Sequence, residues 1–234
     1  MGPSLCETIG VVSFIKDFFS RFTRDRGALS RGTAASISSA LELDDLNAEW
    51  LIVGLGNPGP KYAATRHNVG YMAIDDLLAA TGDVLTPVKG VKAQVAPLQL
   101  GDAAVLAVRS TTFMNLSGEA VGALAAALDI PAERIIVLHD ELDLPAHKTR
   151  IKLGGNENGH NGLKSMSEHL GTRDYLRVRM GIGRPQDGQP IVDWVLGGVD
   201  SGPGFDEAIA TAVEAARLVV TDGLAKAQNL IHSR

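Results

Sequence analysis

The chain has 234 residues, of which 45% are hydrophobic and 21% are charged, a composition typical of a globular protein with one sizeable core. A single cysteine excludes an internal disulfide and a multi-cysteine zinc site, and it fits a reducing, cytoplasmic compartment. No stretch approaches the roughly 18 apolar residues of a membrane-spanning helix, so we expect no membrane span.

Charge is distributed unevenly along the chain. The formal net charge is −5, which by itself argues against a polyanionic partner. Residues 148–184, however, contain eight lysines or arginines and only three acidic residues. Such a local excess is found in proteins that hold a nucleic-acid backbone and also on ordinary solvated surfaces, and charge alone does not separate these interpretations.

Residues 1–48 differ from the rest of the chain and are expected to form an N-terminal extension, helical or flexible. Five apolar side chains on one helical stripe predict a short amphipathic helix: Val11, Ile15, Phe18, Phe19 and Phe22. Small and polar residues from 27 to 42 predict a flexible linker. A secretory signal is not expected, because the segment lacks a basic start; a transit peptide and a tail without function are the alternatives.

From residue 49 onward, strand and helix patterns alternate and predict one domain, residues 49–234. Strands rich in Val, Ile or Leu are expected at 50–54, 93–99, 103–109, 134–139, 148–153 and 175–182. Helices with apolar residues three and four apart are expected at 69–81, 117–128, 161–170 and 205–221, the last ending at Gly223. This alternation predicts a three-layer α/β/α domain with a mixed central sheet covered by helices on both faces.

Three glycines in LIVGLGNPGP, residues 51–60, have the spacing of a dinucleotide-binding loop: Gly54, Gly56 and Gly59. Pro58 and Pro60 remove two backbone N–H donors that such a loop would offer to a pyrophosphate. The acidic residues at the expected distance, Asp75 and Asp76, fall on a predicted helix instead of ending a strand. We therefore do not expect a bound dinucleotide.

Four polar loops follow predicted strands, and in an α/β sheet such loops gather where ligands bind. Their sequences are GNPGPKYAATRHN, TTFMNLSG, HDELDLP and GGNENGHNG. Together they carry a set of histidines, acids and amides suited to chemistry: Asn57, His67, Asn68, Asn115, His139, Asp140, Glu141, Asp143, His160 and Asn161.

Nucleophilic and metal-assisted chemistry receive little support from these loops. No serine stands in a G-x-S-x-G turn, and Ser117 is expected to cap a helix. No H-E-x-x-H motif and no helically spaced histidine pair is present, so we expect no metal. General-base hydrolysis is better supported, because these loops offer His67 as a base and Asp140 as the carboxylate that orients it. The alternative for His67 is a surface histidine near a helix start.

Neutral amide side chains complete this chemistry. Asn57, Asn115 and Asn161 each offer N–H donors and a carbonyl acceptor without net charge, as needed to grip a peptide backbone or an oxyanion. Each one taken alone is better explained as a turn former. Their presence in three loops expected to be adjacent favours a shared site.

Six sequence blocks resemble the bacterial-type peptidyl-tRNA hydrolases, in the same order and over about residues 50–230. These blocks are WLIVGLGNPGPKYAATRHNVGYMAIDDL, TTFMNLSGEAV, HDELDLP, GHNGLKS, LRVRMGIGRP and TDGLAKAQN. The resemblance implies a monomeric α/β enzyme without metal or cofactor. It also implies hydrolysis of the ester between peptide and tRNA, which recycles tRNA for translation.

The same resemblance implies roles for individual residues. His67 would be the catalytic base and Asp140 its partner. Substrate contacts would come from Asn57, Asn115 and Asn161, with Tyr62 and Met114 lining the peptide channel. Lys152 and Arg179, with Arg150 nearby, would bind the 5′-phosphate of the tRNA. The glycines of residues 51–60 would let the chain turn tightly beside the substrate, with Asn57 projecting into the site.

Two features depart from the family pattern. Asn156, Glu157 and Asn158 stand where the family usually has glycines or a histidine, and Glu157 would place a negative charge near the RNA. The extension, residues 1–48, has no counterpart in the family pattern. His160 is expected to stabilise its own loop, with contact to the substrate as the alternative. An RNA-binding protein that has lost catalysis and a metal-dependent hydrolase are the alternatives.

Overall fold

A mixed seven-stranded sheet forms the centre of the computed structural model, which describes residues 40–186 and 188–234. The strands are β1 (Trp50–Gly54), β2 (Thr86–Pro87), β3 (Ala93–Leu100), β4 (Ala103–Ser110), β5 (Ile135–Glu141), β6 (Thr149–Leu153) and β7 (Leu176–Gly181). Their order is β2-β3-β4-β1-β5-β7-β6. Strands β4, β1, β5 and β7 are parallel, whereas β2, β3 and β6 pair antiparallel with their neighbours.

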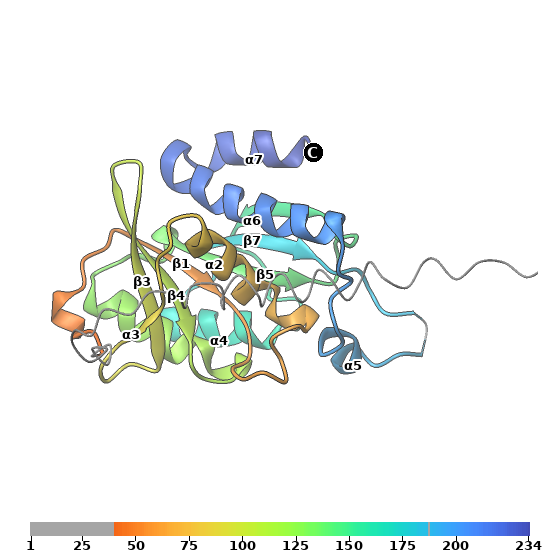
Figure 1. The fold of residues 1–234 in the computed structure, drawn as a ribbon, viewed down its shortest axis with the longest axis horizontal. Helices are drawn as coiled ribbons and strands as arrows, with labels where there is room; N and C mark the ends of the chain where they lie inside the picture. Colours follow the sequence, from red (N-terminus) through yellow and green to blue (C-terminus); the bar gives the residue numbers. More distant parts are fainter. Residues whose placement is uncertain (1–39, 187) are drawn as a thin grey trace, which may run out of the picture. The chain divides into compact units, whose positions relative to one another are not determined.

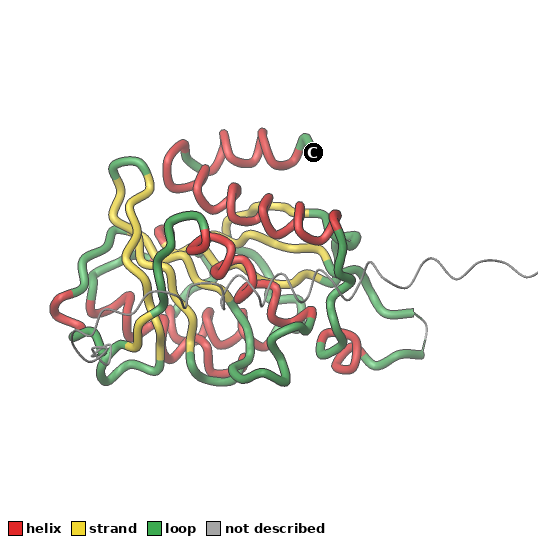
Figure 2. The backbone as a smooth tube through the Cα atoms, in the orientation of Figure 1, coloured by secondary structure: helices red, strands yellow, loops and turns green. Residues whose placement is uncertain are grey.

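Helices cover both faces of this sheet (Figures 1 and 2). They are α2 (Val69–Ala79), α3 (Ser117–Ala127), α4 (Asn161–Leu170), α5 (Ile191–Val195), α6 (Pro203–Asp222) and α7 (Leu224–His232). One core lies between the sheet and α2, α6 and α7, and the other lies between the sheet and α3 and α4. None of the helices in the described part of the chain has the length and apolar character needed to cross a bilayer.

Alternating side chains along the strands explain the two cores. On β1, Ile52 faces the α2 side while Leu51 and Val53 face the α3 side, as period-two alternation requires. The central strands are buried on both faces, because helices cover each of them. The predicted three-layer α/β/α class is therefore confirmed.

All six expected strands and four expected helices are present, and their ends agree with the expected ones to within two residues. Besides four 3₁₀ turns, three elements of the described residues lie outside the predictions: β2, α5 and α7. Strand β2 has two residues and α5 has five, too few for a periodic pattern to register. Gly223 ends α6 as predicted, with φ of 85°, and the chain then continues directly into α7.

Residues 40–48, assigned above to the extension, contain side chains that pack on the domain. Leu41 forms a β-bridge with Val88, and Ala48 is buried in the core on the α3 side. The predicted amphipathic helix lies outside the described residues, as does most of the linker.

The glycines of residues 51–60 serve packing more than turning. A Cβ on Gly54 would lie 2.3 Å from the carbonyl oxygen of Gly70, and one on Gly56 would lie 2.6 Å from the ring of Tyr71. Only Gly59 among them has a positive φ, of 99°. The expectation that all three permit a tight turn is thus wrong for the first two, which allow α2 to approach β1 closely.

Candidate active site

Three side chains from separate loops meet at the carboxyl end of β5. His67 lies in a short 3₁₀ turn that leads into α2, Asp140 lies near the end of β5, and His160 immediately precedes α4. His67 Nδ1 is 2.9 Å from Asp140 Oδ1 and 3.1 Å from Oδ2. His160 Nε2 is 3.0 Å from the same Oδ1. The predicted pairing of His67 with Asp140 is present, although 73 positions separate them.

The hydrogen bonds assign the proton positions on both rings. His160 Nδ1 accepts the backbone N–H groups of Gly162 and Leu163, so its proton is on Nε2, from which it donates to Asp140. His67 donates to Asp140 from Nδ1, which leaves the lone pair of its Nε2 for another partner. The second nitrogen of His67 is therefore the basic atom of the cluster.

Burial and charge act against each other on these groups. Burial opposes protonation of His67, but the charge and hydrogen bond of Asp140 outweigh it and raise the pKa of His67 above 6.5. Burial also opposes ionisation of Asp140, yet His67 and His160 together hold the pKa of this carboxyl well below its usual range. Asp140 is thus a carboxylate that stabilises the imidazolium of His67.

His139 lies beside this cluster without joining it. Burial and the neighbouring His160 lower the pKa of His139 to about 3, so its ring is neutral. Its Nδ1 donates to the backbone carbonyl of Asp140 at 2.7 Å.

The cluster is poorly suited to a metal ion. Ligand atoms of His67, Asp140 and His160 lie within 4.8 Å of one another, a spacing that a metal could bridge. A metal on His160 Nε2 would have to displace the proton donated to Asp140, while Nδ1 is already used to accept two backbone N–H groups. A neutral imidazole has one nitrogen lone pair and one N–H, so it cannot bind a metal through Nε2 and also accept backbone N–H groups at Nδ1. Metal binding would therefore disrupt the start of α4.

A pocket of about 180 Å³ opens beside the cluster. His67, Asp140, His160 and Asn161 contribute to its polar side, and α5 contributes Ile191, Val192 and Val195 to its apolar side. Asn161 is therefore brought into the same pocket as His67, as predicted.

Helix α5 is held beside the pocket by Arg66, the residue that precedes His67. The guanidinium of Arg66 lies 3.8 Å from the centre of the Trp194 ring and donates to the Trp194 carbonyl at 3.3 Å. The backbone N–H of Arg66 donates to the backbone carbonyl of Gly197 at 2.9 Å. Arg66 thus links the α5 side of the pocket to the segment that carries His67.

A second set of polar contacts, outside the lining of the pocket, joins Asn57, Asn68 and the backbone of Met114. Asn57 Oδ1 accepts the backbone N–H of Met114 at 2.8 Å. The side chain of Asn68 both accepts from the Asn57 N–H and donates to its carbonyl, each at 2.9 Å. Met114 reaches the position of Gly162 on α4, which follows Asn161. Asn57 is therefore fixed beside the loop that carries Asn161.

The other expected substrate contacts lie nearer the surface and also outside the pocket lining. Tyr62 packs edge-on against the exposed Phe113, with ring centres 6.3 Å apart. Asn115 is exposed and its side chain makes no hydrogen bond with the described residues. Ser117, expected as a helix cap, is instead the first residue of α3 and donates its hydroxyl to the Met114 carbonyl at 2.9 Å.

The three expected phosphate contacts share one face of the sheet. Arg150 and Arg179 are paired across β6 and β7, and Lys152 lies two residues further along β6 on the same face. Burial and the charge of Arg179 lower the pKa of Lys152. Arg179 is already bonded to Glu141, with Nε 2.9 Å from Oε2.

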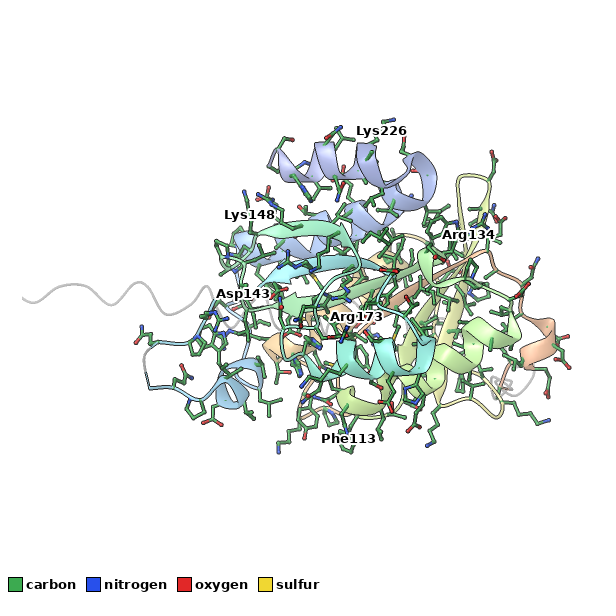
Figure 3. All side chains as sticks on the ribbon, turned by 180° about the vertical axis from the view of Figure 1, so that it is seen from behind. Phe113, Arg134, Asp143, Lys148, Arg173 and Lys226 are labelled. Carbon is green, nitrogen blue, oxygen red and sulfur yellow. The ribbon has the colours of Figure 1, made fainter. Side chains whose placement is uncertain are left out.

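Glu157 does not present an open charge to a ligand, contrary to the sequence expectation. It is 7% exposed, and its Oε1 accepts from Arg173 Nε at 2.6 Å. This contact lowers the pKa of Glu157 to about 2. Arg173 lies beside α4 in Figure 3. The buried Arg177 donates to the carbonyls of Gly155 and Asn156, so the loop before His160 is tied down by two arginines.

Sequence reasoning missed four contributions: the clamp by Asn68, the bond of His160 to Asp140, the pairing of Glu141 with Arg179, and the Arg66–Trp194 contact. Asn68 and Glu141 each stand next to a predicted catalytic residue in the sequence. A polar residue buried beside a catalytic one is the signal that singles them out.

Comparison with known proteins places this site in a family. Residues 51–234 match the family described as peptidyl-tRNA hydrolase. The chain belongs to the peptidyl-tRNA hydrolase family. Membership of this family confirms the expected enzyme class, an ester hydrolase acting in translation.

Individual peptidyl-tRNA hydrolases are similar over most of the chain. A protein from Corynebacterium glutamicum named peptidyl-tRNA hydrolase 2 is 62% identical over 189 residues, which cover 80% of this chain and 89% of the relative. The crystal structure of peptidyl-tRNA hydrolase from Acinetobacter baumannii has a TM-score of 0.72 and 33% identity, covering 80% of this chain and 96% of that one.

A third relative bears on the extension. Peptidyl-tRNA hydrolase 2 from Corynebacterium jeikeium is 46% identical over 236 residues and matches 95% of this chain and 98% of its own length. A match of that length must include much of residues 1–48. This relative therefore has a counterpart of the extension, although the family match itself begins at residue 51.

Proposed function

We propose that this peptidyl-tRNA hydrolase cleaves its ester by general-base catalysis, with His67 as the base. The observation that carries the proposal is the hydrogen bond from His67 Nδ1 to Asp140, because it leaves the Nε2 lone pair available to a water molecule. The raised pKa of His67 makes this nitrogen a stronger base than an ordinary imidazole.

The reaction begins when a water molecule gives a proton to His67 Nε2 and adds to the ester carbonyl. Asp140 stabilises the imidazolium that forms, and amide side chains stabilise the oxyanion. The tetrahedral intermediate then releases the ribose 3′-oxygen, which takes a proton from the imidazolium. No step in this sequence requires a metal ion or a cofactor.

Neutral asparagines give a physical basis for selecting a blocked amino group. Asn57, Asn115 and Asn161 are proposed to contact the peptide backbone, with Tyr62 and Met114 beside it. A substrate with an unblocked α-ammonium would find no opposite charge among these amides, so its desolvation would be uncompensated.

The tRNA is proposed to bind through its phosphates, at Arg150, Lys152 and Arg179. Binding at such a cluster depends strongly on salt, because counterions are released from the RNA. A single chain contains all the proposed groups, consistent with a monomer acting in the cytoplasm, where its single cysteine stays reduced.

The test is hydrolysis of an N-acetylated aminoacyl-tRNA by the wild type and by His67→Ala, each with and without EDTA. Turnover that persists in EDTA and is lost in the variant supports the proposal. Turnover abolished by EDTA would assign the reaction to a metal hydrolase. Tight tRNA binding without turnover in either protein would indicate a binding protein.

A further inference from the structure

Two neighbouring carboxylates at the end of β5 have different partners. Asp140 bonds to His67 and His160, whereas Glu141 bonds to Arg179, because consecutive strand residues face opposite sides of a sheet. Glu141 is only 6% exposed. The catalytic carboxylate and the partner of the proposed phosphate-binding arginine are thus adjacent in the chain.

Glu141 is held in one position. Its Oε2 accepts from Arg179 Nε at 2.9 Å, and its Oε1 accepts the backbone N–H of Asp143 at 3.1 Å. Its backbone carbonyl accepts from Ile182 at 3.0 Å. A carboxylate bonded through both oxygens and through its backbone provides a rigid support for a guanidinium.

The positively charged side chains around Glu141 outnumber its single carboxylate. Arg150, Lys152 and Arg179 share one face, and Glu141 is the carboxylate that contacts this group. In the described part of the chain, the ammonium of Lys152 makes no hydrogen bond or ion pair with a protein group. This excess of positive charge on neighbouring side chains fits an anionic ligand such as a phosphate.

The Arg179 guanidinium is planar, so a bond at Nε fixes the plane in which its terminal N–H groups lie. Those terminal groups make no hydrogen bond with the described residues, and the side chain is 18% exposed. We infer that Glu141 is a positioning residue that aims the terminal N–H groups of Arg179, beside Lys152, at the 5′-phosphate of the tRNA. The inference rests on the proposed function, which places the tRNA at this face.

The sign of one measured effect separates positioning from a simple charge effect. If Glu141 acted only as a nearby negative charge, its removal would strengthen phosphate binding. If Glu141 positions Arg179, its removal weakens phosphate binding, because the guanidinium must then be ordered when the ligand binds.

The experiment compares KM for one N-acetylated aminoacyl-tRNA carrying a 5′-phosphate with KM for the same tRNA after dephosphorylation. It uses the full-length wild type, Glu141→Ala, Glu141→Gln and the control Asp143→Asn. Asp143 pairs with Arg184 at the surface, so this control removes an equal charge without touching Arg179 (Figure 3).

We expect the wild type to have a KM about tenfold lower for the phosphorylated tRNA, as one charge-assisted hydrogen bond would give. Glu141→Ala brings the two KM values together, with a smaller effect on kcat than on KM. Glu141→Gln keeps part of the preference, since its amide oxygen still accepts from Arg179. Asp143→Asn keeps the wild-type ratio.

An unchanged or larger preference for the phosphate in Glu141→Ala would overturn the inference, as would equal KM values in the wild type. The ratio of the two KM values compares two substrates of the same enzyme sample, so a partial loss of folded protein does not change it. If Glu141→Ala does not fold, the ratio in Glu141→Gln decides in the same way. Failure of the proposed function looks different: if the tRNA is not bound at this face, the wild type itself shows equal KM values, whereas failure of the inference alone leaves the wild-type preference intact in Glu141→Ala.

Discussion

His160 donates from Nε2 to Asp140 Oδ1 over 3.0 Å, while its other ring nitrogen accepts two backbone N–H groups at the start of α4. One side chain thus caps a helix and orients the carboxylate that His67 uses. The expectation that His160 stabilises its own loop is confirmed, and the bond to Asp140 adds a second role. Because the two roles use different nitrogens, a substitution can separate them.

The variant His160→Asn should keep the cap and lose the bond to Asp140, since asparagine is among the best N-cap residues. Asp140 then has His67 as its one remaining side-chain donor and interacts with it more strongly, so the pKa of His67 rises further. We expect the acid limb of kcat/KM to move to higher pH, with stability changed by less than about 1 kcal/mol. Rate profiles between about pH 5 and about pH 9 measure the limb. If the acid limb of kcat/KM stays at its wild-type pH, His160 does not influence the pKa of His67.

The variant Asp140→Asn tests the other end of this hydrogen bond. Its amide can donate to His67 Nδ1, which moves the ring proton to Nε2 and removes the base. We expect kcat to fall by about 10²- to 10⁴-fold. The pKa of His67 should also fall, because burial then acts without the opposing carboxylate, so residual activity begins at lower pH. A loss of less than tenfold, measured on protein with a wild-type circular dichroism spectrum, would exclude general-base catalysis by this pair.

The sequence singled out His67 and Asp140 because both residues follow local rules. His67 stands in a polar loop before a helix, and Asp140 stands at the end of a buried strand, the edge where ligands bind in α/β sheets. Their pairing was implied by the family resemblance and not by these local rules, because the contact depends on the packing of α2 against β5. Glu157 shows the same limit, since its charge is neutralised by Arg173, 16 positions away.

The short elements escaped prediction for a related reason. Helix α5 has five residues, and its place beside the pocket depends on the contact between Arg66 and Trp194, which are 128 positions apart. Its exposed Ile191 and Val192 carry no local signal of a pocket wall. Periodicity reports burial along one element and carries no information on which distant element provides the partner.

The clamp on Asn57 provides a third prediction. Asn68→Ala leaves the backbone N–H and carbonyl of Asn57 without their partners in a buried site, since Asn68 is 1% exposed. We expect a loss of about 1–3 kcal/mol in the free energy of unfolding, together with a higher KM, because Asn57 no longer holds its position. Urea denaturation and steady-state kinetics give the two quantities. Asn229→Ala, at an exposed residue of α7, is the control. Equal stability of Asn68→Ala and this control would show that the clamp is unimportant.

The ion pair between Glu157 and Arg173 predicts a stability that depends on pH. The pKa of Glu157 is lowered from 4.5 to about 2 in the folded protein, so the pair stabilises above pH 4.5, and this stabilisation is lost as pH falls towards 2. The side chain of Arg173 is 65% exposed, so solvent screening weakens this ion pair.

Glu157→Gln should therefore be less stable than the wild type at neutral pH, and the difference should shrink below about pH 4.5. Thermal unfolding of both proteins at several pH values measures this difference. Glu168→Gln, an exposed residue on α4, is the matched control and should change stability by less than about 0.5 kcal/mol. A difference between Glu157→Gln and the wild type that stays constant down to about pH 3 would mean that the lost contact is not electrostatic.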